Sequence, residues 1–275
     1  MSYVNLNGRI LKEAEAHFPV AAWSLRFGYG LFETMLVQDG RIRLAHYHWE
    51  RLTRSMETLG WSFPPHFGSS DLEEAVLRTV AHNNMQAACR VRLQLFTGRS
   101  GLFDQEPHTS QFLVECMEVQ PAALVWNENG LMLGISNSVR KSTDMLANLK
   151  TTNTLLYTLA ADEAKRHKWN DALILNSHER LAESTIANLF IINGKQVITP
   201  PLSEGCIAGT LRRFLIENIP GIRESPITSQ DLASASEVFL VNAVRGIKWV
   251  GEISGVRYQN RLTKEIYESL FFNKM

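Results

Sequence analysis

Strand-like and helix-like patterns alternate along the whole 275-residue chain, and this alternation restricts the fold more than any other feature. Residues 90–96 (RVRLQLF) alternate between apolar and polar side chains, which is typical of a half-buried strand. Residues 46–59 instead carry apolar side chains every three or four positions, the spacing of a helix that buries one face: Trp49, Leu52, Met56 and Leu59. The chain therefore belongs to the α/β or α+β class.

Turn and cap signals place further elements in the first half of the chain. Asp39-Gly40 separates two strands, expected at 31–37 and 41–44, because both central positions of a type I′ turn need positive φ. Ser70 is the expected N-cap of a helix over residues 71–83.

The composition changes after the strand expected at residues 112–119, where Pro121 begins a short apolar stretch. A chain of this length is long enough for two domains of roughly 100–200 residues. We therefore expect an N-terminal α/β domain over residues 1–118, a linker over 119–124 and a C-terminal domain over 125–275.

The second half continues the alternation of strands and helices. Strands are expected at 131–136, 172–176, 188–192, 196–199 and 237–242, with Asn193-Gly194 as a hairpin turn. Helices are expected over 151–167, from Gly209 onward, and at the C-terminus around Leu262, Ile266 and Leu270. The helix over 151–167 places its apolar side chains on one side: Leu155, Leu156, Leu159, Ala160 and Ala164.

Charge and hydropathy exclude several classes of protein. Lys and Arg together number 28, as do Asp and Glu, so the net charge is zero and a general nucleic-acid binder is disfavoured. No run of about 18 apolar residues or signal-peptide pattern is present, so we expect no membrane span and a cytoplasmic protein.

Cys89, Cys116 and Cys206 are far apart and form no CxxC pair, which fits a reducing compartment. We expect them to be buried as small apolar side chains.

Lys150 is the first candidate for chemistry. It precedes a helix and follows the apolar stretch MLANL, and an amine in apolar surroundings can stay neutral and attack a carbonyl carbon. A surface lysine before a helix is the ordinary alternative. Lys141 is the nearby competitor, but its neighbours Arg140 and Ser142 predict a more solvated environment.

Three further positions could bind parts of a cofactor. Glu183 lies between a turn and an apolar strand, where a carboxylate can hold a protonated ring nitrogen or simply face water. The helix that opens at Gly209-Thr210-Leu211 offers unpaired N–H groups to a phosphate, although most helix starts bind nothing. Arg51 borders the apolar face of its helix and can reach a phosphate or extend to solvent. The pair His46-x-His48 lacks further ligands at metal spacing, so we expect no metal.

Four segments, in order, resemble the class IV aminotransferase family of fold-type IV pyridoxal-phosphate enzymes. They are RFGYGLFETMLVQDGRIRLAHYHWERL, LKTTNTLLYTLAADEAKRHKWNDALILN, ERLAESTIANLFIINGKQVITPPLSEGCIAGTLRR and EVFLVNAVRGIKWV. The resemblance implies a two-domain architecture like that of D-amino acid aminotransferase, with a smaller N-terminal α/β domain and a larger C-terminal barrel-like domain. It also implies a homodimer and an amino-acid-like small-molecule substrate.

The resemblance assigns roles to residues of this chain. Lys150 would bind the aldehyde of pyridoxal phosphate as a Schiff base and move protons, and Glu183 would hold the ring nitrogen. The phosphate would be bound by Arg51, Thr210, Leu211 and Ala243, with Asn242 nearby. Five residues are expected on the substrate side only because of where they lie relative to the segments that resemble the family: Arg26, Tyr29, Glu33, Arg99 and Asn153.

The resemblance is closest in pattern to aminodeoxychorismate lyase, because Asn153 follows the lysine by three residues and Asn242-Ala243 replaces the Gly-Thr usual in transaminases. Leu155 also stands where those transaminases carry tyrosine. Against the lyase, Tyr29 replaces an aspartate, and the loop TGRSG is short. The expected reaction is elimination of pyruvate from 4-amino-4-deoxychorismate. The alternatives are transamination of a branched-chain or D-amino acid with 2-oxoglutarate, and a non-catalytic binding member of the fold.

Overall fold

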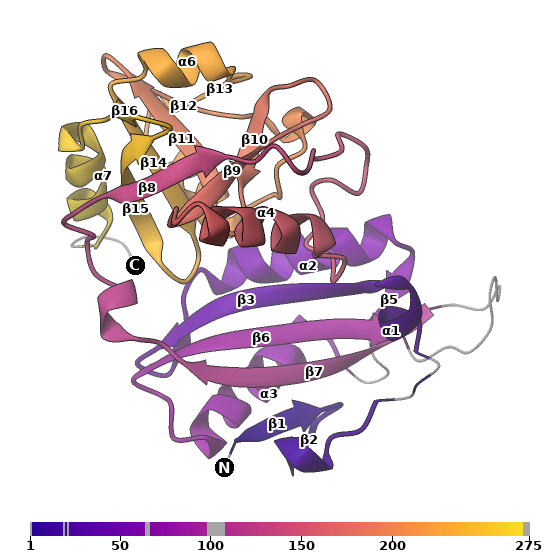
Figure 1. The fold of residues 1–275 in the computed structure, drawn as a ribbon. Helices are drawn as coiled ribbons and strands as arrows, with labels where there is room; N and C mark the ends of the chain where they lie inside the picture. The colour runs from indigo at the N-terminus through magenta and orange to yellow at the C-terminus, as the bar shows by residue number, and fades with distance from the viewer. Residues whose placement is uncertain (1, 19, 21, 64–66, 98–107, 272–275) are drawn as a thin grey trace. The chain divides into compact units, whose positions relative to one another are not determined.

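The computed structural model describes residues 2–18, 20, 22–63, 67–97 and 108–271 (Figure 1). The chain divides into two compact units. The first consists of Met1–Ala123 together with Lys150–Asn153, and the second of Leu124–Leu149 and Thr154–Met275. None of the described helices combines the length and the apolar character needed to cross a membrane.

The first unit is built on a seven-stranded sheet in the order β2-β1-β7-β6-β3-β4, with β5 added beside β7. All pairings are antiparallel except that of β5 with β7. The strands are β1 (Tyr3–Leu6), β2 (Arg9–Lys12), β3 (Gly30–Gln38), β4 (Arg41–Ile42), β5 (Trp61–Ser62), β6 (Ala88–Thr97) and β7 (His108–Glu118). The expected turn between β3 and β4 is confirmed, since Asp39 and Gly40 have φ of 50° and 71°.

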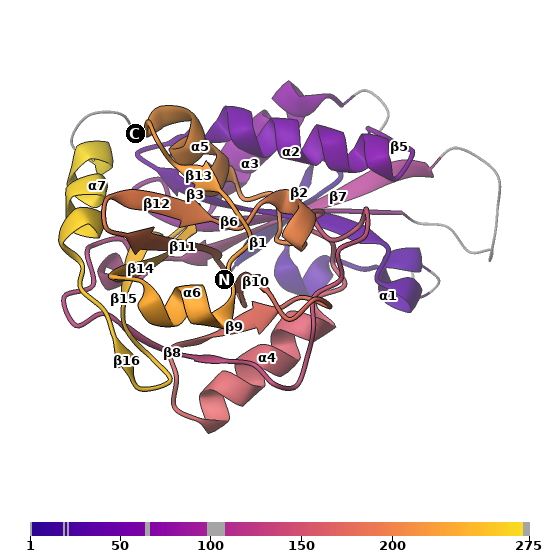
Figure 2. The same ribbon diagram turned by 90° about the horizontal axis from the view of Figure 1, so that it is seen from above.

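Helices α2 (Ala45–Thr58) and α3 (Ser69–His82) cover one side of this sheet (Figure 2). Helix α1 (Trp23–Phe27) and the 3-10 turns Glu13–Glu15 and Pro121–Ala123 complete the unit. The expectation that Ser70 caps α3 is wrong. The N-cap is Gly68, whose N–H donates to the Asp71 carboxylate at 2.7 Å, so the helix begins earlier.

The buried face of α2 differs from the predicted one. Leu52 and Met56 are buried as expected, but His48 and Ser55 complete the buried row, whereas Trp49 is only partly buried. Two polar residues therefore face the sheet. His48 is accommodated because β3 presents a buried carboxylate, Glu33, toward it, and the Ser55 hydroxyl donates to the carbonyl of Arg51 within the helix.

The second unit contains a closed barrel of six strands in the order β10-β9-β8-β15-β14-β11, closed by the pairing of β10 with β11. Strands β12 and β13 extend it beyond β11, and β16 pairs with β15. The bounds are β8 (Leu131–Ile135), β9 (Asp171–Leu175), β10 (Leu181–Ser184), β11 (Asn188–Asn193), β12 (Gln196–Thr199), β13 (Arg223–Glu224), β14 (Glu237–Asn242), β15 (Gly246–Ile253) and β16 (Val256–Arg257). All six barrel strands share one apolar core, to which they contribute Leu133, Leu173, Leu181, Leu189, Leu240 and Val250.

Four helices and one 3-10 turn join these strands. They are α4 (Leu155–Arg166), the 3-10 turn Leu202–Glu204, α5 (Thr210–Asn218), α6 (Ser229–Ser234) and α7 (Arg261–Phe271). The expected start of α4 is wrong. The helix begins at Leu155 rather than 151, because residues 150–152 pair with β3. Two of its apolar residues, Leu155 and Leu159, are exposed at 65% and 44%.

Candidate active site

A β-bulge decides which way the side chain of Glu183 points. Leu181 of β10 pairs with Leu175 of β9, whereas Glu183 pairs with Ile174, so two residues of β10 span one residue of β9. Because successive side chains of a strand alternate between its faces, the extra residue turns Glu183 away from the face on which Leu181 joins the apolar core. A carboxylate is thereby kept out of a purely apolar environment.

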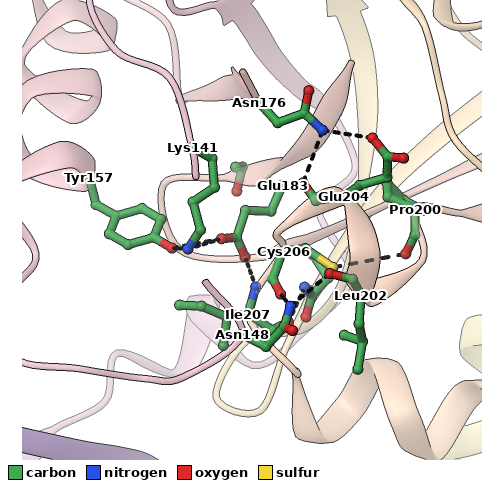
Figure 3. Close-up of polar contacts among 12 residues, drawn as sticks. Lys141, Asn148, Tyr157, Asn176, Glu183, Pro200, Leu202, Glu204, Cys206 and Ile207 are labelled. Atoms are coloured by element: carbon green, nitrogen blue, oxygen red, sulfur yellow. Dashed lines mark hydrogen bonds and ion pairs between the residues drawn. The ribbon is translucent and has the colours of Figure 1, made fainter. Parts of the chain in front are cut away.

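The carboxylate of Glu183 is buried, at 3% exposure, and receives three polar contacts (Figure 3). The Tyr157 hydroxyl donates to Oε1 at 2.7 Å, and the Lys141 ammonium lies 3.1 Å from the same oxygen. The backbone N–H of Ile207 donates to Oε2 at 3.0 Å. Burial of an ionised carboxylate is unfavourable unless it is paired and hydrogen-bonded, and these contacts supply both conditions.

Lys141 is buried, at 7% exposure, so the expectation of a solvated environment for it is wrong. Its backbone N–H donates to Leu175 at 2.9 Å, and its carbonyl accepts from Ser177 at 3.1 Å, which fixes it beside the end of β9. Arg140 takes the exposed position instead and pairs with Glu179. Adjacent residues on an extended segment face opposite sides, so only one of the two cations can point inward.

Tyr157 of α4 completes a triangle of polar groups. The Lys141 ammonium donates to the Tyr157 hydroxyl as well as lying against Glu183. Burial raises the pKa of Tyr157 well above its usual range, and the charge of Glu183 and the hydrogen bond to it raise it further. The phenol therefore stays protonated and remains a donor to the carboxylate.

Glu163 of α4 holds the segment that leads to Lys141. Its carboxylate accepts from the hydroxyls of Ser136 and Ser138 at 2.6 and 2.7 Å, and from the backbone N–H groups of Asn137 and Ser138. Burial would raise the pKa of Glu163, but these hydrogen bonds lower it to about 2. Helix α4 thus fixes two parts of the site, because it carries Tyr157 and anchors the chain before Lys141.

The segment that supplies the Ile207 N–H is tied down on both sides. The Asn148 amide donates to the carbonyls of Leu202 and Cys206 at 2.8 and 2.7 Å. Gly205 has a φ of 87°, and a Cβ added to it would lie 2.1 Å from the carbonyl oxygen of Ser142. Glycine is required at this position because the backbone passes directly over the residue after Lys141.

Helix α5 begins at Thr210, three residues after Ile207 and directly after Gly209. No side chain caps this helix, and among the described residues no hydrogen bond is made to the N–H of Thr210 or Leu211. The N–H of Gly209 donates to Ile207, which links the helix start to the donor that contacts Glu183. An uncapped N-terminus presents N–H donors and the positive end of the helix dipole to an anion.

Asn242, at the end of β14, shapes its own turn. Its side-chain oxygen accepts from the N–H groups of Val244 and Arg245 at 3.1 and 2.7 Å, and its amide donates to Ile186. The backbone of Ala243 follows directly, and α5 packs against β14. The expected contribution of Asn242 and Ala243 to phosphate binding stays a prediction.

In the first unit, Glu33 of β3 is the centre of a second buried cluster. Arg51 binds both of its oxygens, with Nε 2.7 Å from Oε1, and His48 Nδ1 lies 2.6 Å from Oε2. Burial would raise the pKa of Glu33, but the charges of Arg51 and His48 and their hydrogen bonds lower it to about 2. Glu33 thereby fixes the guanidinium of Arg51, and its expected contact with substrate stays a prediction.

His48 is fully buried beside this pair. Burial lowers its pKa, and the charges of Arg51 and Lys150 add to the lowering, although Glu33 opposes it. Its Nδ1 faces Glu33, and its Nε2 is a buried atom without a hydrogen-bond partner in the described part of the chain. The burial of His48 is not predicted by the sequence, in which this residue is only half of the candidate metal pair His46-x-His48.

Lys150 belongs to the first unit because its backbone pairs with β3. Its carbonyl accepts from Phe32 at 2.9 Å, Thr151 forms a bridge with Leu31, and the N–H of Thr152 donates to Gly30 at 2.8 Å. The ammonium lies 4.4 Å from the centre of the Phe32 ring. The position of this amine is therefore set by β3 and not by the helix that follows it.

The contacts of the residues expected on the substrate side say little about their roles. Tyr29 donates to the carbonyl of Leu59 at 3.4 Å, Arg26 is exposed on the last turn of α1, and Asn153 lies against Gly28. Arg99 lies outside the described residues. Within the described chain, no group of three His, Cys, Asp or Glu side chains is arranged to hold a metal ion.

Each unit therefore presents its own group of predicted residues. In the first unit Arg51, Glu33 and Lys150 are brought together, and in the second Glu183 lies next to the segment that opens α5. Sequence reasoning missed Lys141, Tyr157 and His48. The signal for Tyr157 in the sequence is a hydroxyl-bearing aromatic residue among the leucines at the start of the helix, LLYTL.

The family model for amino-transferase class IV matches residues 30–253, which span every element described above from β3 to β15. The chain belongs to the class IV aminotransferase family. This family membership confirms the resemblance found in the sequence, and it makes the chain an enzyme of the lyase and aminotransferase type.

Known members of the class IV aminotransferase family differ in their reactions. Aminodeoxychorismate lyase of Vibrio harveyi is 26% identical over 244 residues, which cover 87% of this chain and 89% of that protein. The branched-chain aminotransferase of Thermoproteus uzoniensis, solved with norvaline, has a TM-score of 0.86 and 26% identity, covering 98% of this chain and 93% of that one. The branched-chain aminotransferase of Escherichia coli, with a TM-score of 0.87 and 22% identity, shares the fold, with 99% and 94% covered.

Glu33→Gln is expected to reduce stability in a pH-dependent way. Because the fold lowers the pKa of Glu33 to about 2, its charge contributes roughly 3 kcal/mol above the usual glutamate range, and this contribution is lost as the pH falls toward 2. Urea unfolding of wild type and Glu33→Gln between pH 2 and 7 should show a difference in the free energy of unfolding that shrinks on acidification. Glu50→Gln, at a more exposed position of α2, is the control and should change little. A gap independent of pH would contradict the assignment.

Gly205→Ala is expected to destabilise the protein by about 2 kcal/mol or more, because the added methyl group meets the Ser142 carbonyl and the positive φ is strained. The matched control is Gly221→Ala, where φ is 83° but no atom lies within 4 Å of the added Cβ, so only backbone strain of about 1 kcal/mol applies. Chemical denaturation measures both. Equal losses for the two variants would show that the segment at Gly205 can move aside.

Proposed function

We propose that this chain is a pyridoxal-phosphate-dependent lyase that eliminates pyruvate from 4-amino-4-deoxychorismate and releases 4-aminobenzoate for folate synthesis. The observation that carries the cofactor assignment is the buried carboxylate of Glu183, which keeps an acceptor position beside the uncapped start of α5. Family membership supports the same cofactor, because the class IV aminotransferases are pyridoxal-phosphate enzymes.

The contacts of Glu183 leave room for the cofactor's ring nitrogen. An ionised carboxylate offers about four lone-pair positions. Lys141 and Tyr157 take the two on Oε1, and the Ile207 N–H takes one on Oε2. The remaining position on Oε2 can accept the N–H of a protonated pyridine ring.

The residues that would hold the phosphate come from the elements the sequence indicated. The N–H groups of Thr210 and Leu211 at the start of α5 suit a phosphate oxygen, and Ala243 offers another backbone N–H. Arg51 would add a guanidinium whose direction is fixed by Glu33. Together these groups would fix the ring while its nitrogen binds Glu183.

Lys150, and not Lys141, is the amine that would bind the aldehyde. The aldehyde carbon and the nitrogen of a pyridoxal ring lie on opposite sides of the ring. Lys141 contacts Glu183, the group on the nitrogen side, and cannot reach across. Lys150 lies beside an aromatic ring on β3 and also matches the lysine of the family pattern.

The residues of the chain divide the work of the reaction. Pyridoxal phosphate, when bound, would supply an electron sink next to the carbon that bears the substrate's amino group. Lys150, as a neutral amine, would take the proton from that carbon. The enolpyruvyl group leaves with its ether oxygen and, after gaining a proton, becomes pyruvate. Loss of this group leaves an aromatic ring, which favours elimination.

Two features support the lyase over a transaminase. Asn153 and the pair Asn242-Ala243 match the lyase pattern, and the Vibrio harveyi relative carries the lyase name. Tyr157 does not replace the tyrosine missing at Leu155, because its hydroxyl is engaged by Glu183.

Transamination of a branched-chain or D-amino acid is the second candidate. It is supported by the likeness to the Thermoproteus uzoniensis branched-chain aminotransferase, which covers almost the whole chain. A non-catalytic binding member is disfavoured, since a binding protein needs neither Lys150 nor Glu183.

We also propose that the chain acts as a homodimer in the cytosol. Apolar side chains are exposed on α4 and on the segment before it: Met145, Leu146, Leu155 and Leu159. Leu155 and Leu159 lie one helical turn apart and would be covered by a second copy. The three cysteines are unpaired, in keeping with a reducing compartment. Light scattering of the purified protein measures the oligomeric state, and a monomer would contradict the dimer.

Lys150→Ala is expected to abolish covalent attachment of pyridoxal phosphate. Wild-type protein incubated with the cofactor and reduced with borohydride should gain the mass of the reduced adduct on the peptide that contains Lys150. The variant should keep its fold by circular dichroism and gain no adduct. An adduct on Lys141 in wild type would overturn the assignment, and wild-type protein that takes up no cofactor would overturn the proposed function.

The two candidate reactions are separated by two incubations of the loaded enzyme. With 4-amino-4-deoxychorismate we expect 4-aminobenzoate and pyruvate in equal amounts. With leucine or D-alanine and 2-oxoglutarate we expect glutamate at less than about one hundredth of that rate, because the lyase needs no second keto acid. Fast formation of glutamate without 4-aminobenzoate would favour the transaminase.

A further inference from the structure

Lys141 and Tyr157 have no place in the roles assigned above, yet both are buried against Glu183. They come from different elements, since Lys141 follows β8 and Tyr157 lies on α4, and each is fixed separately. Backbone hydrogen bonds to Leu175 and Ser177 fix Lys141, and the helix that carries Tyr157 is anchored through Glu163. Two separately fixed side chains thus contact the same oxygen of Glu183, and this arrangement needs an explanation.

We infer that Lys141 and Tyr157 are positioning residues that keep Glu183 ionised and turned toward the ring nitrogen of the cofactor. This role rests on the proposed function. Both residues contact Oε1, so the carboxylate cannot rotate without breaking two contacts, and Oε2 stays directed by the Ile207 N–H. An ionised, immobile acceptor is what a protonated ring nitrogen requires.

The charges around Glu183 support this inference. Lys141 is the cation that pairs with it in the described part of the chain. Tyr157 stays protonated, and burial raises the pKa of Cys206 to about 12, with the charge of Glu183 adding to it, so this thiol is neutral too. Beyond Cys206, Arg212 of α5 pairs with Glu224 of β13. Without the Lys141 ammonium, Glu183 would be a buried carboxylate held only by dipoles, the Tyr157 hydroxyl and the Ile207 N–H.

The test compares Lys141→Met, Lys141→Arg and Tyr157→Phe with wild type. Lys141→Met keeps an unbranched side chain that is shorter by only the Nζ atom and removes the charge, whereas Lys141→Arg keeps the charge. Arg140→Met is the matched control, because it makes the same kind of change at the neighbouring residue, whose partner Glu179 is exposed. Two properties are measured for each: the pH at which half of the pyridoxal phosphate is released on acidification, by absorbance, and the melting temperature of the cofactor-free protein at pH 5 and pH 8.

Removing the Lys141 charge should move the release midpoint to higher pH by about one to three pH units, because the buried carboxylate that accepts from the ring nitrogen loses the cation beside it. Lys141→Arg keeps the charge, so its release midpoint should stay close to that of wild type. Tyr157→Phe should give a smaller shift in the same direction as Lys141→Met, and Arg140→Met should give none. In cofactor-free Lys141→Met the melting temperature should fall more at pH 8, where the carboxylate is charged, than at pH 5.

The inference is overturned if Lys141→Met and Tyr157→Phe release the cofactor at the wild-type pH and melt as wild type does at both pH values. If Lys141→Met does not fold, Tyr157→Phe alone decides, since it removes a single oxygen atom. If wild-type protein binds no pyridoxal phosphate, the proposed function fails and the role of Lys141 fails with it. If wild type binds the cofactor through Lys150 and only the variants behave unexpectedly, the proposed function stands and the role of Lys141 alone is wrong.

Discussion

The burial of an ionised carboxylate at Glu183 is the interaction on which the second unit depends most. A charge with 3% exposure is tolerated only if partners reach it from several directions, and here they come from the segment after β8, from α4 and from the segment before α5. Each of these segments is itself anchored, as Glu163 and Asn148 show. The local structure around the site is therefore organised to stabilise one negative charge.

The first unit solves the same problem with other groups. Glu33 is buried on the central part of β3, and it contacts Arg51 and His48 of α2 rather than apolar side chains. A helix that gives two positions of its buried face to polar residues loses apolar contact. In exchange, the guanidinium of Arg51 is held in a fixed direction by Glu33, and a fixed guanidinium is suited to binding an anion such as a phosphate.

Periodicity and turn chemistry predicted most strands and helices because these depend on local sequence. The hairpin at Asp39-Gly40 and the strand Glu237–Asn242 are examples. The failures share a cause in tertiary contacts. Helix α4 starts late because residues 150–152 pair with β3, and the buried row of α2 includes His48 because Glu33 faces it. Lys141 could not be recognised as a partner of Glu183, because 42 residues separate them and only the bulge and the pairing of the barrel strands bring them together.

The short segment Lys150–Asn153 shows that backbone pairing, and not the neighbouring sequence, decides which unit a residue belongs to. Its neighbours in sequence on both sides belong to the second unit, but its own backbone pairs with β3 in the first. The amine at Lys150 is therefore placed by the same strand that carries Glu33, whereas the acceptor at Glu183 is placed by the barrel and its bulge. A substitution near β3 can shift the amine without altering the contacts of Glu183, and one near α4 can alter those contacts without moving the amine. Because separate sets of contacts hold Lys150 and Glu183, the surroundings of each side chain can be altered by substitution while the contacts of the other are kept.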